Sequence, residues 1–268
     1  MAALGKVYLV GAGPGAPDLL TLRAARLLGC ADVVFHDALV HPETLALACR
    51  ARHIAVGKRC GKHSTAQAFI NKRLVDAVQK HAVVVRLKGG DPMLFGRAQE
   101  EIDALVAAGI DFEVVPGITT ALAAAAQIST SLTQRGISRN VCFVTPRVGK
   151  SEQPSDWAQA VLNADTAALY MGAGQAADIR DTLLARGMAA DTPALLIENV
   201  SLPQSREIPC TLGSLESASA ALGDGPCLIM LGEVLRAGRS GQRPVAEWLA
   251  EALIDSDVSH TRRPKVSM

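Results

Sequence analysis

Short runs of β-branched residues alternate with helical patterns along most of the chain, and this alternation is the feature that most restricts the fold. The strand-like runs are almost continuously apolar, as in strands that are buried on both faces of a sheet. We therefore predict an α/β fold. The expected strands are Val7–Val10, Val33–Phe35, Val83–Leu87, Phe112–Val115, Val141–Thr145, Ala167–Met171, Ala194–Glu198 and Leu228–Leu231. The expected helices are Leu19–Leu28, Ala66–Lys80, Gln99–Ala108, Trp157–Leu162 and Ala176–Arg186.

The expected strands divide into two sets on either side of Pro116-Gly117. A chain of 268 residues suits one large or two ordinary domains. We predict an N-terminal α/β domain over residues 1–117 and a C-terminal α/β domain over 118–245, with a ligand cleft between them. Residues 255–268 contain few apolar side chains, which predicts a disordered tail.

Composition excludes several classes of protein. No apolar run approaches the ~20 residues that span a bilayer, and no secretory signal is visible at the N-terminus, so we expect a cytoplasmic protein without a membrane anchor. Six cysteines are scattered without a C-x-x-C pair, mostly in apolar stretches. This pattern is typical of reduced, buried thiols and indicates neither a disulfide framework nor a metal site.

The first expected strand ends in glycines, in the stretch VYLVGAGPGAPDLLT. Gly11, Gly13 and Ala16 satisfy the dinucleotide pattern G-x-G-x-x-G/A. Pro14 and Pro17, however, remove two backbone N–H groups that would bind a pyrophosphate, and they delay the helix, which we expect to begin with Asp18 as N-cap. An NAD-dependent Rossmann oxidoreductase is thus one alternative, and a turn without any ligand is another.

Basic residues are concentrated between Arg50 and Arg97, where eleven Lys or Arg face only two acids, Asp76 and Asp91. Such a surplus predicts an anionic partner. Aromatic residues make up only 3% of the chain, and none is interleaved with the basic cluster, so nucleic acid is disfavoured. A polycarboxylate or phosphate ligand fits better. A non-enzymatic anion-binding module and a merely solvated helix face remain alternatives.

Three further junctions follow expected strands: Gly89-Gly90-Asp91, Pro116-Gly117 before Thr119-Thr120, and Met171-Gly172. In open α/β sheets ligands bind beyond the carboxyl ends of the strands, so these loops are expected to line one cleft with the first glycine turn. Loop amides and a single aspartate suit a compact zwitterionic nucleoside better than a pyrophosphate.

Several motifs occur together and in order: VYLVGAGPGAPDLLTLRAARLL, VVFHDALV, VGKRCGKH, VVRLKGGDPMLFGRAQEE, FEVVPGITTALAAAAQISTSLTQRG and ALYMGAG. Together they resemble the tetrapyrrole methylase (class III methyltransferase) family, over roughly residues 5–236. The resemblance implies two α/β domains with S-adenosylmethionine between them, no metal, and a homodimer. It also implies methylation of uroporphyrinogen III at C2 and C7 to give precorrin-2, for sirohaem or cobalamin biosynthesis. A related tetrapyrrole substrate is the alternative within the family.

The resemblance also implies roles for individual residues. Asp37 matches the family's proton acceptor and Lys58 its proton donor; the alternative for Asp37 is an N-cap of the helix that follows LVHPE. The implied cofactor site consists of Pro14, Gly89, Gly90, Asp91, Leu94, Thr119, Thr120, Met171 and Val200.

Substrate carboxylates are expected to pair with basic side chains, with one acid positioned for pyrrole N–H groups. The expected substrate-binding residues are Arg59, Arg97, Glu100, Arg135 and Arg147. The chain departs from many relatives at Gln134, where they carry His, and at Pro146-Arg147, where they carry Gly-His. A general-base role at position 147 is excluded, because arginine stays protonated. No dehydrogenase or ferrochelatase segment precedes Gly5, which predicts a methylase that stands alone.

Overall fold

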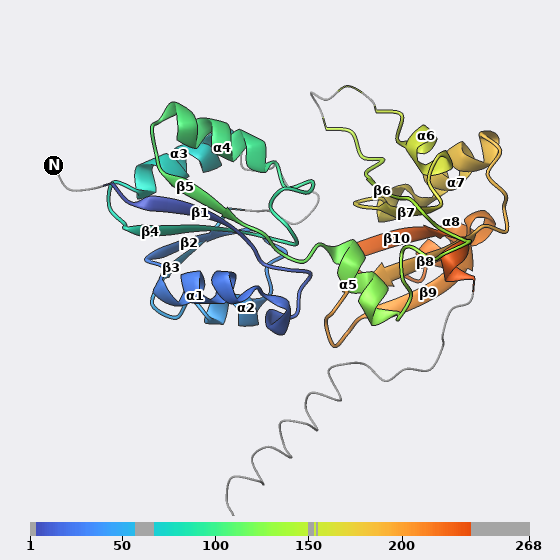
Figure 1. Ribbon diagram of the computed structural model, residues 1–268, viewed down its shortest axis with the longest axis horizontal. Helices are drawn as coiled ribbons and strands as arrows, with labels where there is room; N and C mark the ends of the chain where they lie inside the picture. The colour runs from blue at the N-terminus through green and yellow to red at the C-terminus, as the bar shows by residue number, and fades with distance from the viewer. Residues whose placement is uncertain (1–3, 57–66, 150–152, 154, 237–268) are drawn as a thin grey trace, which may run out of the picture.

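Two five-stranded sheets, each with helices on both faces, form two α/β domains in the computed structural model (Figure 1). The structure describes residues 4–56, 67–149, 153 and 155–236. The predicted fold class is therefore confirmed. The predicted domain limits remain a prediction, although the last strand of the first sheet ends at Val115.

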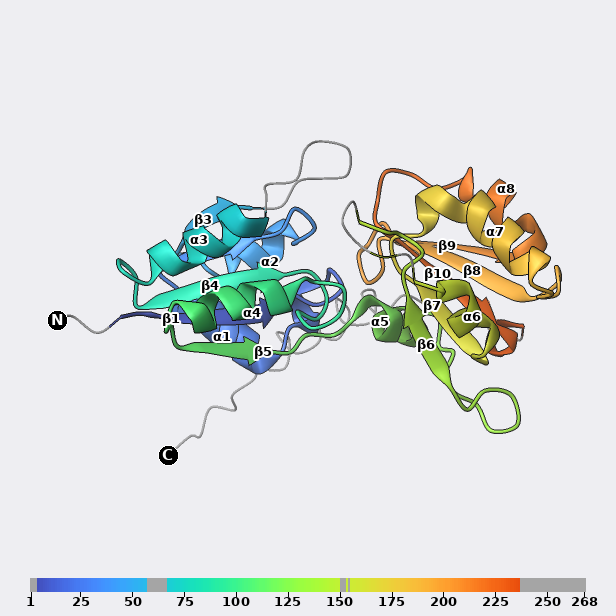
Figure 2. The same cartoon turned by 90° about the horizontal axis from the view of Figure 1, so that it is seen from above.

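The first sheet is entirely parallel, with the strand order β3-β2-β4-β1-β5. Its strands are β1 (Lys6–Gly11), β2 (Val33–His36), β3 (Arg52–Ala55), β4 (Val83–Lys88) and β5 (Phe112–Val115). Helices α1 (Leu22–Cys30) and α2 (Pro42–Ala46) cover one face, and α3 (Gln67–Ala77) and α4 (Ala98–Ala107) cover the other (Figures 1 and 2).

Side chains of β1 alternate between two hydrophobic layers, as the pleat of a strand requires. Val7 and Leu9 pack with Leu74 and Leu105 from α3 and α4. Val10 packs with residues of α1 on the opposite face. Because both faces are covered, the strands contain apolar residues at consecutive positions, and this is why the sequence revealed them.

The second sheet is mixed, with the order β6-β7-β10-β8-β9; β6 and β7 are parallel and the other neighbours are antiparallel. Its strands are β6 (Val141–Val144), β7 (Thr166–Leu169), β8 (Pro193–Glu198), β9 (Arg206–Thr211) and β10 (Cys227–Gly232). Consequently β6, β7 and β8 run in the same direction, and their carboxyl ends lie on the same side of the sheet.

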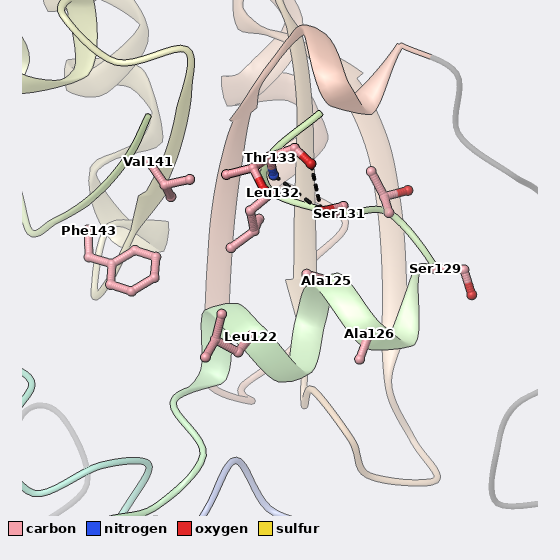
Figure 3. A pocket seen from close by; sticks show the side chains of 10 residues that line it. Leu122, Ala125, Ala126, Ser129, Ser131, Leu132, Thr133, Val141 and Phe143 are labelled. Atoms are coloured by element: carbon pink, nitrogen blue, oxygen red, sulfur yellow. Dashed lines mark hydrogen bonds between the residues drawn. The ribbon is translucent and has the colours of Figure 1, made fainter. Parts of the chain in front are cut away.

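One face of this second sheet is covered by α5 (Thr120–Gln127), whose Ala121 and Ala124 pack against Ile197 and Met230. An open apolar hollow of about 530 Å³ lies beside α5 and is drawn in Figure 3. Its lining includes Leu122 and Phe143.

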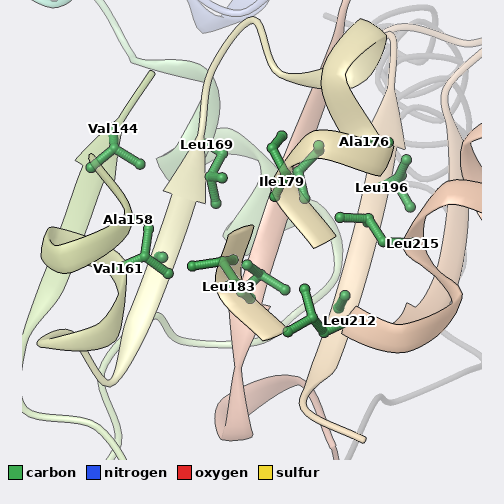
Figure 4. Packing of buried hydrophobic residues seen from close by; sticks show 14 residues of the cluster. Val144, Ala158, Val161, Leu169, Ala176, Ile179, Leu183, Leu196, Leu212 and Leu215 are labelled. Atoms are coloured by element: carbon green, nitrogen blue, oxygen red, sulfur yellow. The ribbon is translucent and has the colours of Figure 1, made fainter. Parts of the chain in front are cut away.

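The other face carries α6 (Trp157–Leu162), α7 (Ala176–Ala185) and α8 (Leu215–Ser219). Figure 4 shows their cluster of fully buried side chains, among them Leu169, Ile179, Leu183, Leu196 and Leu212. Single 3-10 turns are η1 (Pro17–Leu19), η2 (Ala173–Gln175), η3 (Leu212–Ser214) and η4 (Glu233–Leu235).

The sequence missed two strands and misplaced the start of one helix. Strands β3 and β9 were not predicted, because many of their positions are exposed or polar, and β9 also contains Pro209, which a strand at the edge of a sheet tolerates. The first helix does not begin at Asp18: Pro17–Leu19 forms a 3-10 turn, and Thr21 caps α1 by accepting from the Ala24 N–H at 3.1 Å.

The thiols are less buried than expected. Cys30 and Cys49 are exposed, while Cys142, Cys210 and Cys227 are half-buried. The prediction of buried thiols was wrong for this exposed pair, since Cys30 is the last residue of α1 and Cys49 lies in the turn after α2, and both positions face solvent. Within the described ranges, no helix has the length and apolarity needed to cross a bilayer.

Candidate ligand site at the strand ends

The loops that follow β1 and β4 are hydrogen bonded to each other at the carboxyl edge of the first sheet. The Gly90 N–H donates to the Gly13 carbonyl at 2.8 Å, and the Gly13 N–H donates to the Gly90 carbonyl at 3.2 Å. Both glycines have a left-handed backbone, with φ of +73° at Gly13 and +64° at Gly90. The two glycine motifs of the sequence therefore form one joined structure.

Gly117, in the loop after β5, packs directly on this structure. A Cβ at Gly117 would lie 2.3 Å from the Gly90 carbonyl oxygen and 2.9 Å from Gly11 Cα. Only glycine permits such a close approach between backbones. Three loops that are far apart in the sequence are thus brought together, as the sequence predicted for strand exits.

The Asp91 carboxylate connects two of these loops. One oxygen accepts from the Gly117 N–H at 2.9 Å, and the other accepts from the Met93 N–H at 2.8 Å. Each carboxylate oxygen can accept more than one hydrogen bond, so capacity for a ligand remains. The sequence predicted ligand contact for Asp91 and missed this bracing role.

Loops of the second domain meet the first domain at the same place. The Ser201 hydroxyl, just after the buried Val200, accepts from the Ala16 N–H at 3.0 Å. Met171 follows β7 and leaves 47% of its surface exposed. Both Met171 and Ser201 adopt a positive φ, of 57° and 67°. Such strained backbone is concentrated at functional loops.

Tyr170, just after β7, contacts both the start of α5 and the loop after β4 in the first domain. Its hydroxyl accepts from the Ala121 N–H at 3.0 Å and lies 2.7 Å from the Thr119 hydroxyl. Its ring lies 5.1 Å from that of Phe95, which belongs to the loop after β4. Burial raises the pKa of Tyr170, so the phenol stays neutral. The sequence motif predicted a role for Met171 and none for its neighbour Tyr170.

A buried group of charges lies beneath the loop after β4. Arg86 donates to Asp37 Oδ1 at 2.5 Å and to Glu101 Oε1 at 2.9 Å, while Lys88 donates to Glu101 Oε2 at 3.0 Å. We call Asp37, Arg86, Lys88 and Glu101 the buried ion cluster. Asp37 is its most accessible member, with 31% of its side chain exposed.

These contacts overturn one alternative for Asp37. The residue before α2 is His41, and it makes no side-chain cap, whereas the Asp37 carboxylate points to Arg86. Asp37 is therefore not a helix N-cap. The contacts also correct the interpretation of the basic surplus, because Arg86 and Lys88 are 3% and 2% exposed and cannot form part of an anion-binding surface.

Burial affects the two cations differently. For Arg86, burial opposes the charge, but the facing carboxylates of Asp37 and Glu101 outweigh it and raise the pKa of the guanidinium. For Lys88, burial and the neighbouring Arg86 charge lower the pKa of the ammonium. Arg86 is therefore the permanent charge that faces Asp37.

The predicted substrate-binding residues are only partly brought together. Arg97 and Glu100 form a two-bond ion pair at the start of α4, with distances of 2.6 and 2.8 Å. Hydrogen bonding from Arg97 lowers the pKa of Glu100. Arg147 is exposed and lies in the loop after β6. Because β6 and β7 are parallel, this loop lies at the same end of the strands as Met171, which follows β7.

Arg135 lies elsewhere. It belongs to the Gln134–Ser138 turn, and the following Arg139 N–H donates to Asp165, at the start of β7. Met171 follows the opposite end of that strand, so within one chain Arg135 is not gathered with the other predicted residues. Lys58 and Arg59 lie outside the described residues.

The hollow of Figure 3 does not coincide with the strand-end loops, although Phe143 in its lining lies edge-on to Tyr170. Where side chains are described, no group of three or more His, Cys, Asp or Glu is arranged to hold a metal ion. The convergent loops, rather than the hollow, therefore define the candidate site.

A parallel α/β domain whose strand-end loops contact those of a mixed α/β domain is the two-domain arrangement implied by the motifs. The model of the family Tetrapyrrole (Corrin/Porphyrin) Methylases matches residues 6–216. The chain belongs to this family, and the predicted resemblance is confirmed.

Relatives are similar over most of the chain. It is 47% identical over 234 residues to a uroporphyrinogen-III C-methyltransferase of Pseudomonas aeruginosa, covering 87% of this chain and 95% of the relative. It is 46% identical to siroheme synthase 3 of Aeromonas hydrophila, over 86% of this chain and 49% of the relative. The chain thus spans about half the length of this second relative.

A solved structure shows the same fold. The uroporphyrin-III C-methyl transferase of Thermus thermophilus, complexed with S-adenyl homocysteine, is 39% identical, with a TM-score of 0.76 over 87% of this chain and 99% of that one.

Proposed function

We propose that this chain transfers methyl groups from S-adenosylmethionine to uroporphyrinogen III, at C2 and C7, and so forms precorrin-2. The observation that carries this proposal is the joined set of glycine loops after β1, β4 and β5, together with the contact of Ala16 with Ser201. These loops occur in a chain that is nearly half identical to a uroporphyrinogen-III C-methyltransferase of similar length.

The residues at the strand ends fit S-adenosylmethionine. Close glycine packing leaves backbone groups where a ligand can approach them, and the missing N–H groups of Pro14 and Pro17 do not affect a ligand that lacks a pyrophosphate. Half-buried Leu94 and exposed Met171 offer apolar surface. The residues proposed to hold the ligand are Pro14, Gly89, Gly90, Asp91, Leu94, Thr119, Thr120, Met171 and Val200.

When bound, S-adenosylmethionine supplies an electrophilic methyl group on a sulfonium. A pyrrole carbon that takes up this methyl becomes part of a cation, and the Asp37 carboxylate is proposed to stabilise that charge and then to accept the departing proton. Arg86 occupies Oδ1 of Asp37. Among the described residues only Arg86 hydrogen bonds this carboxylate, which leaves Oδ2 for the substrate. Lys58 is proposed as the proton donor.

Substrate carboxylates are proposed to pair with Arg59, Arg97 and Arg147, while Glu100 accepts from pyrrole N–H groups; Arg135 is left out, because it lies near the opposite end of β7. Arg97 already has a partner in Glu100, so substrate would either exchange with this pair or extend it. A fixed, forked guanidinium suits bidentate pairing with carboxylates. We also propose a cytoplasmic homodimer.

Calorimetry tests the proposed cofactor. S-adenosylhomocysteine should bind and NADH should not, because the first loop lacks the N–H groups that a pyrophosphate requires. NADH binding without S-adenosylhomocysteine binding would instead indicate a Rossmann oxidoreductase. Binding of neither compound, with a tetrapyrrole polycarboxylate still bound, would indicate a non-enzymatic anion-binding module.

A further inference from the structure

The proposed mechanism uses one member of the buried ion cluster, Asp37, and leaves Glu101 without a role. Glu101 lies on α4 and is completely buried. Its carboxylate accepts from Arg86 at 2.9 Å, from Lys88 at 3.0 Å and from Gln67 at 3.2 Å. Removing a carboxylate from water costs free energy unless partners compensate for it. Here the partners of Glu101 come from α3, through Gln67, and from β4, through Arg86 and Lys88.

The geometry links Glu101 to Asp37 through a single planar group. Arg86 uses Nε for Glu101 and Nη2 for Asp37, while Nη1 donates to the Leu87 carbonyl at 3.1 Å. Since the guanidinium is a rigid fork, an anchor on its Nε side determines where its Nη2 side points. Glu101 therefore determines the direction from which Arg86 approaches Asp37.

The charges of the cluster also balance. Arg86 and Lys88 are cations, and Asp37 and Glu101 are anions. Loss of the negative charge at Glu101 would leave an excess cation, and Arg86 and Lys88 would both compete for Asp37. The Asp37 carboxylate, which is proposed to stabilise the cationic substrate, would then be partly neutralised and displaced from its position.

We propose that Glu101 is a positioning residue, which contacts no ligand and holds Arg86 and Lys88 so that Asp37 presents a free, charged oxygen to the substrate. This inference rests on the proposed function, because it concerns the efficiency of the methylation step and not the binding of the methyl donor.

The test compares Glu101→Gln, Lys88→Met and the double variant in a steady-state assay with uroporphyrinogen III. Glutamine keeps the shape of Glu101 and removes its charge, so kcat should fall about tenfold or more while the affinity for S-adenosylhomocysteine stays within about twofold. Adding Lys88→Met removes the excess cation and should restore most of the lost kcat. Glu113→Gln is the matched control, because Glu113 pairs with Lys6 and Arg23 at the surface, and its kcat should not change.

A double-mutant cycle with Asp37→Asn adds a second readout. If Glu101 acts through Asp37, Glu101→Gln should not lower kcat further once Asp37 is replaced. Full additivity, an unchanged kcat in Glu101→Gln, or no rescue by Lys88→Met would each overturn the proposal. Failure of both the single and the double variant to fold would show a purely structural cluster and overturn it as well.

The wild-type protein in the same assay separates this inference from the proposed function. No methylated product from wild type, with S-adenosylhomocysteine still bound, rejects the proposed substrate. Product from wild type together with an unaffected Glu101→Gln variant rejects only the role of Glu101.

Discussion

Replacing Gly117 by alanine should weaken the binding of S-adenosylhomocysteine markedly while the protein still folds. The new Cβ would stand 2.3 Å from the Gly90 carbonyl oxygen, whereas ordinary contacts begin at 3.4 Å. Gly90 or Gly117 must therefore shift by about 1 Å, and because both neighbours are backbone, no side chain can rotate away. The same shift breaks the hydrogen bond between the Gly117 N–H and Asp91.

The expected stability cost is about 1–3 kcal/mol, the range for overpacking. The expected loss of ligand affinity is about tenfold or more, which corresponds to about 1.4 kcal/mol. Calorimetric titration with S-adenosylhomocysteine measures the affinity, and urea unfolding measures the stability.

Two alanine variants serve as controls. A Cβ at Gly5 would lie 1.8 Å from the His81 carbonyl oxygen, at the opposite end of the first sheet. Gly5→Ala should therefore destabilise the fold without lowering the affinity for S-adenosylhomocysteine. A Cβ at Gly174 would contact nothing within 4 Å, so Gly174→Ala should change neither property. Two results would refute the reasoning. One is an affinity for S-adenosylhomocysteine that is the same in Gly117→Ala and wild type, and the other is a loss of affinity in Gly5→Ala as large as that in Gly117→Ala.

Three further outcomes are expected. Asp37→Asn should lower kcat about tenfold or more while keeping S-adenosylhomocysteine affinity, and parallel loss of affinity would contradict its role toward the substrate. Arg147→Ala should raise the KM for uroporphyrinogen III, as the loss of a charge-assisted contact worth about 1.5–3 kcal/mol requires, and unaltered kinetics in both Arg147→Ala and Arg147→His would show that this arginine does not touch the substrate. Burial raises the pKa of the Cys210 thiol to about 11 and that of Cys227 to about 12. The unfolded chain therefore releases these protons first, so stability should fall as pH rises above 9.0, and Cys227→Ala should flatten that decline in urea unfolding at several pH values.

The sequence predicted most elements of the fold because both faces of each sheet are covered. Central strands such as β1 and β10 then contain nearly unbroken apolar runs, which a sequence pattern reveals directly. The edge strands β3 and β9 were missed because their residues are largely exposed and partly polar, whereas the edge strands β5 and β6 are largely apolar and were predicted. Local pattern alone cannot distinguish such a strand from a loop.

The site was predicted loop by loop, because glycines mark the strand ends. The partners of those loops were not, since Ala16 and Ser201 are 185 positions apart and their contact has no local signal. Arg86 and Lys88 were counted as surface charge, although a charged residue inside the apolar run VVVRLK was an available sign of a buried ion pair. Burial of a charge depends on a partner from another element, here Glu101, and composition does not contain that information.

The central claim is that this chain methylates uroporphyrinogen III. Anaerobic incubation of the protein with uroporphyrinogen III and S-adenosylmethionine, followed by mass analysis of the tetrapyrrole, tests it most directly. A product that has gained two methyl groups, with formation of S-adenosylhomocysteine in the same proportion, is the predicted result. Recovery of unmethylated uroporphyrinogen III from protein that binds S-adenosylhomocysteine would contradict the claim and would indicate a different tetrapyrrole substrate.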